Sequence, residues 1–183
     1  MKSKPVLVDM DGVIANFEEG FLNEWKKKYP ELPFVQLQNR SNFYIRDDYP
    51  QEFLSKVESV YFKKGFILGL KPLEGAIEAL KEMEADGYQV QICTTPLKGN
   101  KFSEEEKIKW VEKYLGKEWL KNLIFIKDKS LVEGDYLVDD KPDIKTTIAP
   151  KWEQIIFDAP YNRNVADKKR LLKWSDWHKV LNS

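Results

Sequence analysis

Short apolar runs that recur along the chain constrain the fold more than any other feature of the sequence. Each run is mostly β-branched or aromatic, and turn-forming or charged residues flank it, as is typical of buried parallel strands. The five clearest runs are residues 6–8 (VLV), 90–93 (VQIC), 123–126 (LIFI), 136–138 (YLV) and 155–157 (IIF). We therefore predict that a parallel sheet forms the centre of the fold.

Two segments between these runs have the apolar spacing of amphipathic helices. Residues 73–86 carry apolar side chains on one helical face, and Gly87 follows as a stop signal. Residues 103–116 begin with Ser103 and Glu106 at the spacing of a capping box. Strands that alternate with helices predict an α/β fold, a parallel sheet flanked by helices.

Residues 17–71 interrupt this alternation. They contain two helix-like segments, 18–29 and 51–61, separated by an irregular stretch rich in aromatic residues, and they show no clear strand. We predict a small helical cap at 17–71, inserted after the first strand, with the α/β core formed by 1–16 and 72–183. The alternative is that these helices simply flank the sheet.

Polar side chains follow four of the apolar runs, where the predicted strands end. They are Asp9 and Asp11 after the first run, Thr94 and Thr95 after the second, Lys129 after the third, and Asp139 and Asp140 after the fourth. In open α/β sheets, ligands bind beyond the carboxyl ends of the strands. We therefore expect these side chains, distant in sequence, to converge at one edge.

Four carboxylates at one edge predict a cation. They cannot all be ionised at low cost unless a positive charge lies between them. Mg²⁺ commonly binds one or two carboxylates, waters and a substrate phosphate, and lysine and threonine side chains can hold the phosphate oxygens. The combination indicates a Mg²⁺-dependent phosphoryl-transfer site.

Each element of this pattern has an ordinary alternative when it is taken alone. Asp-Gly is a turn signal, two adjacent aspartates are often a solvated turn, and a single lysine is usually a surface residue. A calcium-binding loop also begins with Asp-x-Asp, but no third ligand follows here at the required spacing. The prediction therefore rests on the joint placement of these residues after apolar runs.

Length and charge narrow the functional classes. The chain has 183 residues, which suits one domain with a small insertion. Basic and acidic side chains balance at 30 each, so we predict neither a nucleic-acid polymer nor a membrane as a partner. Cys93 is the only cysteine, and no signal-peptide pattern or membrane-spanning run is visible, so we predict a cytoplasmic location. The oligomeric state stays open, a homodimer included.

The same motifs resemble those of the haloacid dehalogenase-like phosphohydrolases. The signature strand with Asp-x-Asp-Gly reads VLVDMDGV, the threonine motif reads ICTTP, and a later lysine, Lys129, precedes YLVDD. A narrower resemblance, to the 5′(3′)-deoxyribonucleotidases, covers nearly the whole chain through segments such as GFILGLKPLEGAIEAL and IKDKSLVEGDYLVDDK. It implies a Rossmann-like core with a cap, and hydrolysis of deoxyribonucleoside monophosphates.

The resemblance also implies a role for each polar residue at the strand ends. Asp9 would be the nucleophile, and Asp11 the general acid and base, which requires a raised pKa. Mg²⁺ would be held by Asp9, the backbone carbonyl of Asp11 and Asp140, with Asp139 in support. The phosphate oxygens would contact Thr94, Thr95 and Lys129, and Gly12 would let the backbone approach the phosphate closely.

In the cap, the resemblance implies contacts with the nucleoside. The candidates are Phe17, Phe43, Tyr44, Ile45 and Phe66, and the alternative for each is ordinary core packing. The family often has tryptophan where this chain has Tyr44, which leaves the preferred base open. It often has serine where this chain has Thr95 and arginine where it has Lys127, and these two differences concern the phosphate contacts. Another small phosphomonoester as substrate, and a catalytically silent nucleotide-binding protein, are the alternative functions.

Overall fold

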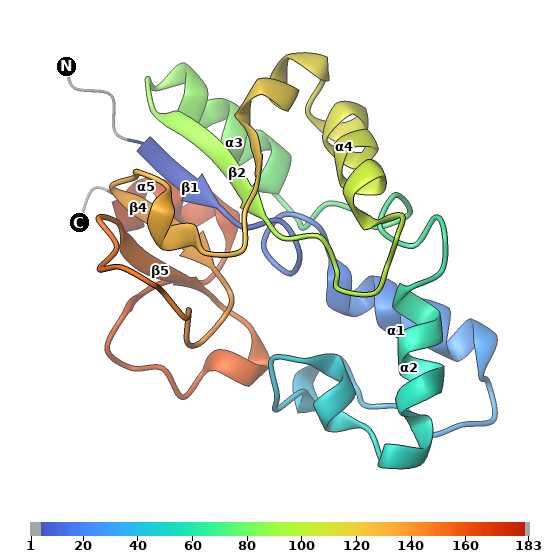
Figure 1. The fold of residues 1–183 in the computed structure, drawn as a ribbon. Helices are drawn as coiled ribbons and strands as arrows, with labels where there is room; N and C mark the ends of the chain where they lie inside the picture. Colours follow the sequence, from blue (N-terminus) through green and yellow to red (C-terminus); the bar gives the residue numbers. More distant parts are fainter. Residues whose placement is uncertain (1–4, 182–183) are drawn as a thin grey trace.

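A six-stranded parallel sheet forms the centre of the computed structural model, which describes residues 5–181 (Figure 1). Its strand order is β3-β2-β1-β4-β5-β6, and every pair of neighbouring strands is parallel. The strands are β1 (Pro5–Val8), β2 (Gln89–Thr94), β3 (Leu123–Phe125), β4 (Tyr136–Asp139), β5 (Glu153–Phe157) and β6 (Lys169–Leu171). The predicted α/β fold is confirmed. Residues 1–4 and 182–183, which we assigned to the core, lie outside the described residues.

Three α-helices accompany the sheet in the core: α3 (Ala76–Ala85), α4 (Ser103–Tyr114) and α5 (Trp177–Leu181). Short 3₁₀ turns lie in the connections: η4 (Lys117–Asn122), η5 (Lys129–Leu131), η6 (Pro160–Asn162) and η7 (Trp174–Asp176). Side chains of α3 and α4 share one apolar cluster with Val6 and Val8, whereas Leu7 on the other face of β1 packs with Trp152. No described helix combines the length and apolar character that a membrane span needs.

The predicted capping box at the start of α4 is wrong. Phe102 occupies the N-cap position and makes no side-chain cap, and the Ser103 hydroxyl instead accepts a hydrogen bond from the backbone N–H of Leu97 at 2.9 Å. The Glu106 carboxylate accepts backbone N–H groups of the 65–68 segment, including that of Ile67 at 3.1 Å. Both side chains satisfy donors of other segments, because those donors would otherwise be buried without partners.

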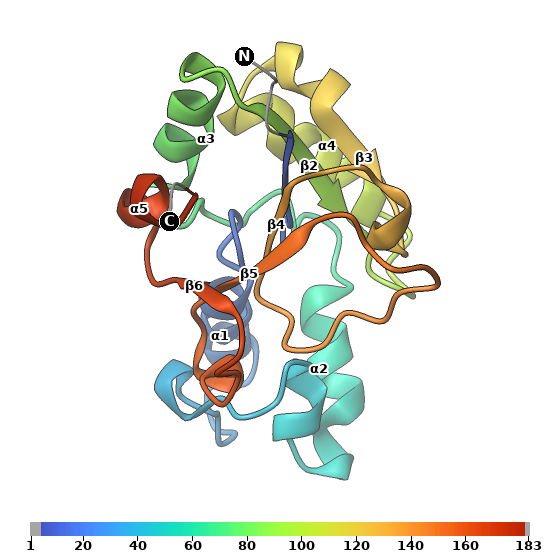
Figure 2. The ribbon, with the colours of Figure 1, turned by 90° about the vertical axis from the view of Figure 1, so that its left-hand side faces the viewer.

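Residues 17–71 are helical, as predicted, and contain no strand. They form α1 (Phe17–Lys28), η1 (Leu37–Asn39), η2 (Ile45–Asp48), η3 (Gln51–Phe53) and α2 (Leu54–Tyr61). Figures 1 and 2 show α1 and α2 beyond the carboxyl ends of β1 and β2. The chain enters and leaves this region side by side, because Asn16 donates its N–H to the Lys71 carbonyl and Leu73 to that of Ile14, both at 2.8 Å. The assignment of 17–71 as a separate cap stays a prediction.

Candidate active site

The first two aspartates follow β1, which lies between β2 and β4 in the middle of the sheet. Asp9 continues the strand pairing, because its N–H donates to the Val138 carbonyl at 2.9 Å. The chain then coils around the carbonyl of Met10, which accepts the N–H groups of Ile14 at 3.0 Å and Ala15 at 2.9 Å. This turn fixes both carboxylates at the carboxyl end of the sheet.

Three carboxylates meet at this edge. Asp9, Asp139 and Asp140 each place an oxygen within 4.8 Å of the others, and Lys129 is their only cationic partner among the described ion pairs. The Lys129 Nζ lies 2.5 Å from both Asp9 Oδ1 and Asp139 Oδ2. Its backbone is held by Trp152, whose indole N–H donates to the Lys129 carbonyl at 2.9 Å.

This cluster fits a divalent cation. The Lys129 ammonium pairs with Asp9 and Asp139 but not with Asp140, so negative charge remains, and Asp140 Oδ1 is buried with no hydrogen-bond partner among the described residues. A buried carboxylate oxygen without a partner is costly, and a hard cation with oxygen ligands would satisfy it. The predicted contribution of Asp11 to the metal is its backbone carbonyl, and that contribution stays a prediction.

Burial and neighbouring charges shift the pKa values of three residues in the site. Burial raises the pKa of Asp140 well above its usual value, and the charges of Asp139 and Asp9 add to the shift. Burial also raises the pKa of Asp139, against the lowering effect of the Lys129 ammonium. Burial lowers the pKa of Lys129, but the charges of Asp9 and Asp139 outweigh it and raise this pKa above its usual value. The lysine therefore stays charged and holds the two carboxylates together.

Asp11 lies in a separate ion pair with a lysine that the sequence prediction missed. The Nζ of Lys107 is 2.7 Å from Asp11 Oδ2 and 2.7 Å from the hydroxyl oxygen of Thr94. Burial raises the pKa of the Asp11 carboxyl, the Lys107 charge opposes this, and the net direction is upward, as predicted. Lys107 is fully buried and lies on the helical face of Trp110 and Val111. In the sequence, Lys107 is a charged residue on the apolar face of a predicted helix, and this signal could have identified it as a candidate site residue.

The two threonines after β2 differ in their surroundings. Thr94 is buried beside Lys107 and Asp11, whereas Thr95 is exposed and donates its hydroxyl to the Ile126 carbonyl at 2.7 Å. The structure therefore brings Thr94, but not the Thr95 hydroxyl, into the hydrogen-bonded group around Asp11. Phosphate binding by either residue stays a prediction.

Gly12 has a specific steric reason to be glycine. Its φ of +78° is in the left-handed region, and a Cβ there would lie 2.3 Å from Asp140 Oδ2 and 3.4 Å from the hydroxyl of Tyr161. A carboxylate, in addition to any phosphate, thus occupies the space that a side chain would need. The Tyr161 hydroxyl also donates a hydrogen bond to the same Asp140 oxygen.

The five predicted substrate contacts fall into two aromatic groups and one core residue. Phe17 packs edge-on against Phe66 with ring centroids 5.2 Å apart. Phe43 contacts Tyr44 at 5.0 Å, and Tyr44 is 55% exposed, while Ile45 is buried in the apolar core. Nucleoside contact by these residues stays a prediction.

The loop with Phe43 and Tyr44 lies next to the carboxylates. Lys141, which directly follows Asp140, places its Nζ 5.2 Å from the Phe43 ring centroid and donates to the Tyr44 hydroxyl at 3.4 Å. Its backbone N–H donates to Asp139 Oδ1 at 2.9 Å. Lys141 thus connects the 43–44 loop to the carboxylate cluster.

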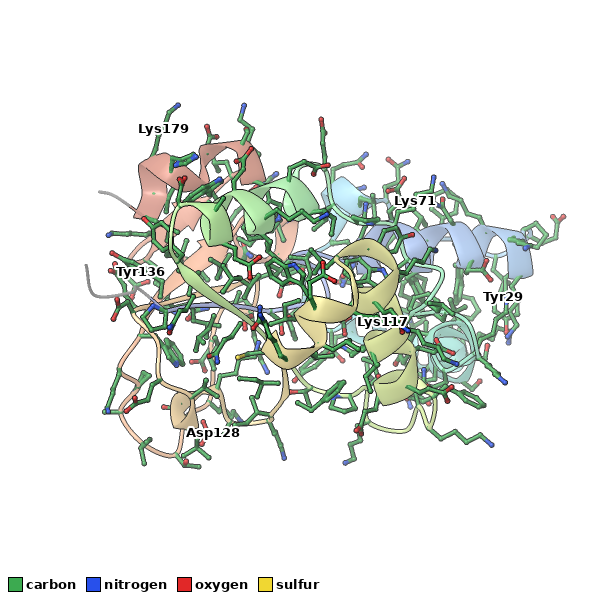
Figure 3. All side chains as sticks on the ribbon, turned by 90° about the horizontal axis from the view of Figure 1, so that it is seen from above. Tyr29, Lys71, Lys117, Asp128, Tyr136 and Lys179 are labelled. Atoms are coloured by element: carbon green, nitrogen blue, oxygen red, sulfur yellow. The ribbon has the colours of Figure 1, made fainter. Side chains whose placement is uncertain are left out.

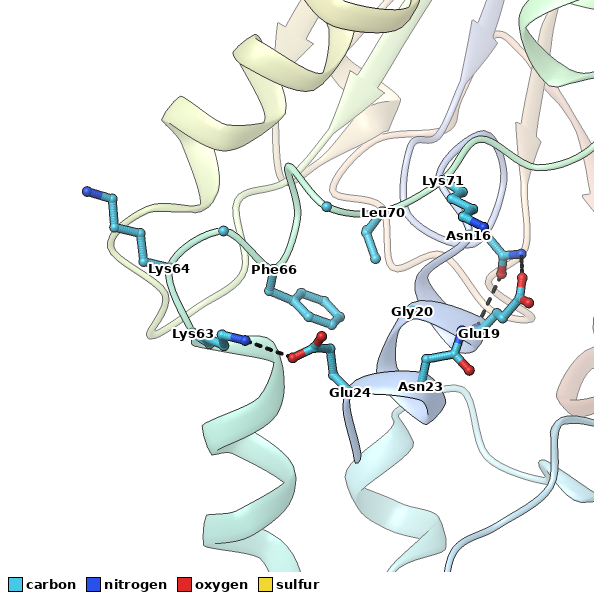
Figure 4. A pocket seen from close by; sticks show the side chains of 12 residues that line it. Asn16, Glu19, Gly20, Asn23, Glu24, Lys63, Lys64, Phe66, Leu70 and Lys71 are labelled. Atoms are coloured by element: carbon cyan, nitrogen blue, oxygen red, sulfur yellow. Dashed lines mark hydrogen bonds and ion pairs between the residues drawn. The ribbon is translucent and has the colours of Figure 1, made fainter. Parts of the chain in front are cut away.

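A cavity of about 370 Å³ lies elsewhere, between α1 and residues 63–71. Figure 4 shows the Phe66 ring at this cavity, together with Gly20 and the 2.8 Å ion pair between Lys63 and Glu24. None of the carboxylates at the sheet edge lines it. We therefore locate the candidate active site by the carboxylates at the carboxyl end of the sheet, and not by the volume of this cavity.

A family profile and individual relatives place this chain among the same group of proteins. The profile of the family "5′ nucleotidase, deoxy (Pyrimidine), cytosolic type C protein" matches residues 3–182. The human cytosolic-type 5′(3′)-deoxyribonucleotidase is 41% identical over 100% of this chain and 95% of its own length. The human mitochondrial 5′(3′)-deoxyribonucleotidase is 40% identical over 97% of this chain and 82% of its own length.

Solved structures share the fold. A haloacid dehalogenase-family (HAD) hydrolase from Deinococcus radiodurans with bound phosphate and sodium has a TM-score of 0.60 at 16% identity, covering 98% of this chain and 95% of that one. A magnesium-bound structure of the same hydrolase class from Bacillus subtilis has a TM-score of 0.62 at 12% identity, covering 100% of both chains. At these identities the likeness concerns the fold alone.

Proposed function

The chain belongs to the 5′(3′)-deoxyribonucleotidase family and has the haloacid dehalogenase-like fold, and we propose that it hydrolyses deoxyribonucleoside 5′(3′)-monophosphates in a Mg²⁺-dependent reaction. One observation supports this most strongly. The carboxylates of Asp9, Asp139 and Asp140 meet at the carboxyl end of the sheet, where Lys129 pairs with the first two, next to an aromatic loop. Such an edge is where α/β sheets bind phosphate-containing ligands.

Asp9 and Asp140 would hold Mg²⁺ in this proposal, with the Asp11 carbonyl as a further ligand and Asp139 in support. The buried, unpartnered Oδ1 of Asp140 is the observation that favours an oxygen-liganded cation there. When bound, the cation would neutralise the crowded carboxylates and the charge of the phosphate.

The covalent steps belong to the two aspartates after β1. Asp9 attacks phosphorus and forms an aspartyl phosphate, while the bond from phosphorus to the nucleoside oxygen breaks. Asp11 gives its proton to that departing oxygen. It then takes a proton from a water, which attacks the aspartyl phosphate, releases inorganic phosphate and restores the Asp9 carboxylate. The raised pKa of Asp11 is consistent with a carboxyl that carries a proton before the first step.

Two buried lysines serve different parts of this reaction. Lys129 holds Asp9 next to Asp139, and its charge lies where phosphate oxygens would bind. Lys107 connects Asp11 to Thr94, so it orients the general acid and the threonine hydroxyl together. We include Lys107 in the proposed site beside Thr94, Thr95 and Lys129.

The cap residues supply the preference for a deoxyribose. Phe17, Phe43, Tyr44, Ile45 and Phe66 are apolar or aromatic, so a ribose 2′-hydroxyl among them would be buried without a partner. That costs roughly 1–3 kcal/mol, or about ten- to a hundredfold in kcat/KM. Among bases, we propose dUMP and dTMP as first candidates. A small nucleotide as partner follows from this proposal, while the cytoplasmic location and the absence of nucleic-acid and membrane partners stay predictions.

The test is a paired assay of dUMP and UMP with Mg²⁺, repeated with EDTA and with a sugar phosphate. We expect a higher kcat/KM for dUMP by about ten- to a hundredfold, and no turnover in EDTA. Equal values for dUMP and UMP would contradict the deoxyribose preference. Faster hydrolysis of the sugar phosphate would favour a general phosphatase, and no hydrolysis of any substrate would favour a silent nucleotide-binding protein.

A further inference from the structure

Tyr161 is buried beside the carboxylate cluster, although no sequence motif singled it out. It lies in η6, two residues after the end of β5, and its hydroxyl donates to Asp140 Oδ2. The following residue holds the backbone of the same aspartate, because Asn162 Nδ2 donates to the Asp140 carbonyl at 2.8 Å and to that of Phe157 at 2.8 Å. The η6 turn thus binds Asp140 through both its side chain and its main chain.

The Asp140 carboxylate has little freedom to rotate. Its Oδ2 lies against the Cα of Gly12, where a Cβ would be only 2.3 Å away, and it accepts the Tyr161 hydroxyl. Its Oδ1 is buried and has no hydrogen-bond partner among the described residues. One oxygen is therefore committed to the protein, and the other is left for a ligand.

The Tyr161 ring also contacts two residues of the 40–48 loop. Phe43 meets it edge-on with centroids 5.8 Å apart, and the Arg40 guanidinium carbon lies 5.5 Å from its centroid. A cavity of about 140 Å³ also lies against the ring and is lined in part by Gly12 and Arg40. Loss of the whole ring would enlarge this cavity, so an informative variant must remove the hydroxyl alone.

We propose that Tyr161 is a positioning residue of the metal site, which orients Asp140 so that Oδ1 faces the cation. This inference rests on the Mg²⁺ site of the proposed function. Partners that orient a metal ligand through a hydrogen bond typically contribute 10–100-fold to metal affinity. The hydroxyl acts through Asp140, and the ring contacts with Phe43 and Arg40 keep the hydroxyl in place.

The test compares Tyr161→Phe with Tyr29→Phe. Tyr29 is a matched control because its hydroxyl also makes a hydrogen bond, to Ser59 Oγ at 2.8 Å, and Figure 3 shows it at the far end of the molecule from Tyr136 of β4. Binding of Mn²⁺ alone is followed by the loss of the free-ion EPR signal, and Mg²⁺ is then measured by competition. Circular dichroism and melting temperature establish that each variant is folded at the temperature of the titration.

We expect the Kd for Mn²⁺ and Mg²⁺ to rise about 10–100-fold in Tyr161→Phe and to stay unchanged in Tyr29→Phe. Raising the Mg²⁺ concentration should restore most of the turnover of Tyr161→Phe with dUMP, because the defect lies in metal binding. A folded Tyr161→Phe variant with the wild-type Kd would overturn the inference while the proposed function stands. A wild-type protein that binds neither ion would instead overturn the proposed metal site, and this inference with it.

Discussion

Two charge clusters, one at the sheet edge and one within residues 17–71, contrast in how completely their charges are paired. Within residues 17–71, Arg40 donates to Glu18 through Nε at 2.7 Å and also binds Asp48. Its remaining donors reach the carbonyls of Asn42 at 2.9 Å and Phe43 at 3.4 Å. At the sheet edge, Lys129 pairs with two of three clustered carboxylates, and Oδ1 of Asp11 and Oδ1 of Asp140 are buried with no hydrogen-bond partner among the described residues.

We expect this contrast to distinguish a cluster that stabilises the fold from one that binds a ligand. Removing one partner from a fully paired buried cluster leaves an uncompensated charge, so such a cluster fixes the shape of the chain around it. An incompletely paired cluster destabilises the folded protein when no ligand is bound, and ligand binding offsets that loss of stability. By this criterion, we expect Arg40 to fix the 40–48 loop that carries Phe43 and Tyr44, and the sheet edge to bind the ligand.

The largest expected effect is the loss of activity in Asp9→Asn. The amide keeps the size of the side chain but is not a nucleophile, so turnover of dUMP should fall by roughly 10⁴-fold or more, as in other nucleophile knockouts. The variant should stay folded, because it removes one of three crowded carboxylates and leaves Lys129 paired with Asp139. Activity above a few per cent of wild type would exclude Asp9 as the nucleophile. Asp135→Asn, on an exposed residue, is the control.

The cap cluster should show the opposite behaviour, loss of stability. Arg40→Met leaves the buried Asp48 carboxylate and the partly buried Glu18 carboxylate without their cation, and we expect the free energy of unfolding to fall by about 3–5 kcal/mol. Arg46→Met is the matched control in the same region, because Arg46 pairs with Glu58 at 3.1 Å on the surface, where about 1 kcal/mol or less is expected. Urea unfolding measures both. Equal effects of the two substitutions would remove the distinction between the clusters.

The smallest effect is the stabilisation of the wild type by Mg²⁺. At 100 times the Kd, a cation that binds only the folded state raises the free energy of unfolding by about 2.7 kcal/mol. Asp140→Asn should lose most of this gain, because it changes the carboxylate with the unpartnered oxygen. The measurement is urea unfolding with and without Mg²⁺. A gain of the same size in Asp140→Asn would mean that the cation binds elsewhere.

The two regions also differ in how far the sequence predicts them. The five apolar runs all became strands of the sheet, since a buried parallel strand needs apolar residues on both faces. The missed strand, β6, reads KRL and has too few apolar residues for such a pattern. In the cap, the sequence predicted helices but not the 3₁₀ turns or the Arg40 cluster.

At the site, the residues that end the strands could be predicted because parallel strands bring their carboxyl ends together. Asp9, Asp139 and Asp140 do meet, and Lys129 bridges Asp9 and Asp139. Lys107 and Tyr161 could not be placed in the same way. Each reaches the site through a tertiary contact, Lys107 from α4 to Asp11 and Tyr161 from η6 to Asp140, and neither contact follows from local spacing.

The central claim is that Asp9 receives the phosphoryl group, and trapping that intermediate tests it most directly. Wild-type protein is mixed with dUMP and Mg²⁺, quenched in acid within the first turnover, digested and analysed by mass spectrometry. We predict one added phosphoryl group on the peptide that contains both Asp9 and Asp11, with fragment ions that assign it to Asp9. Turnover with no phosphorylated peptide, or with the group on Asp11 or on another residue, would contradict the account.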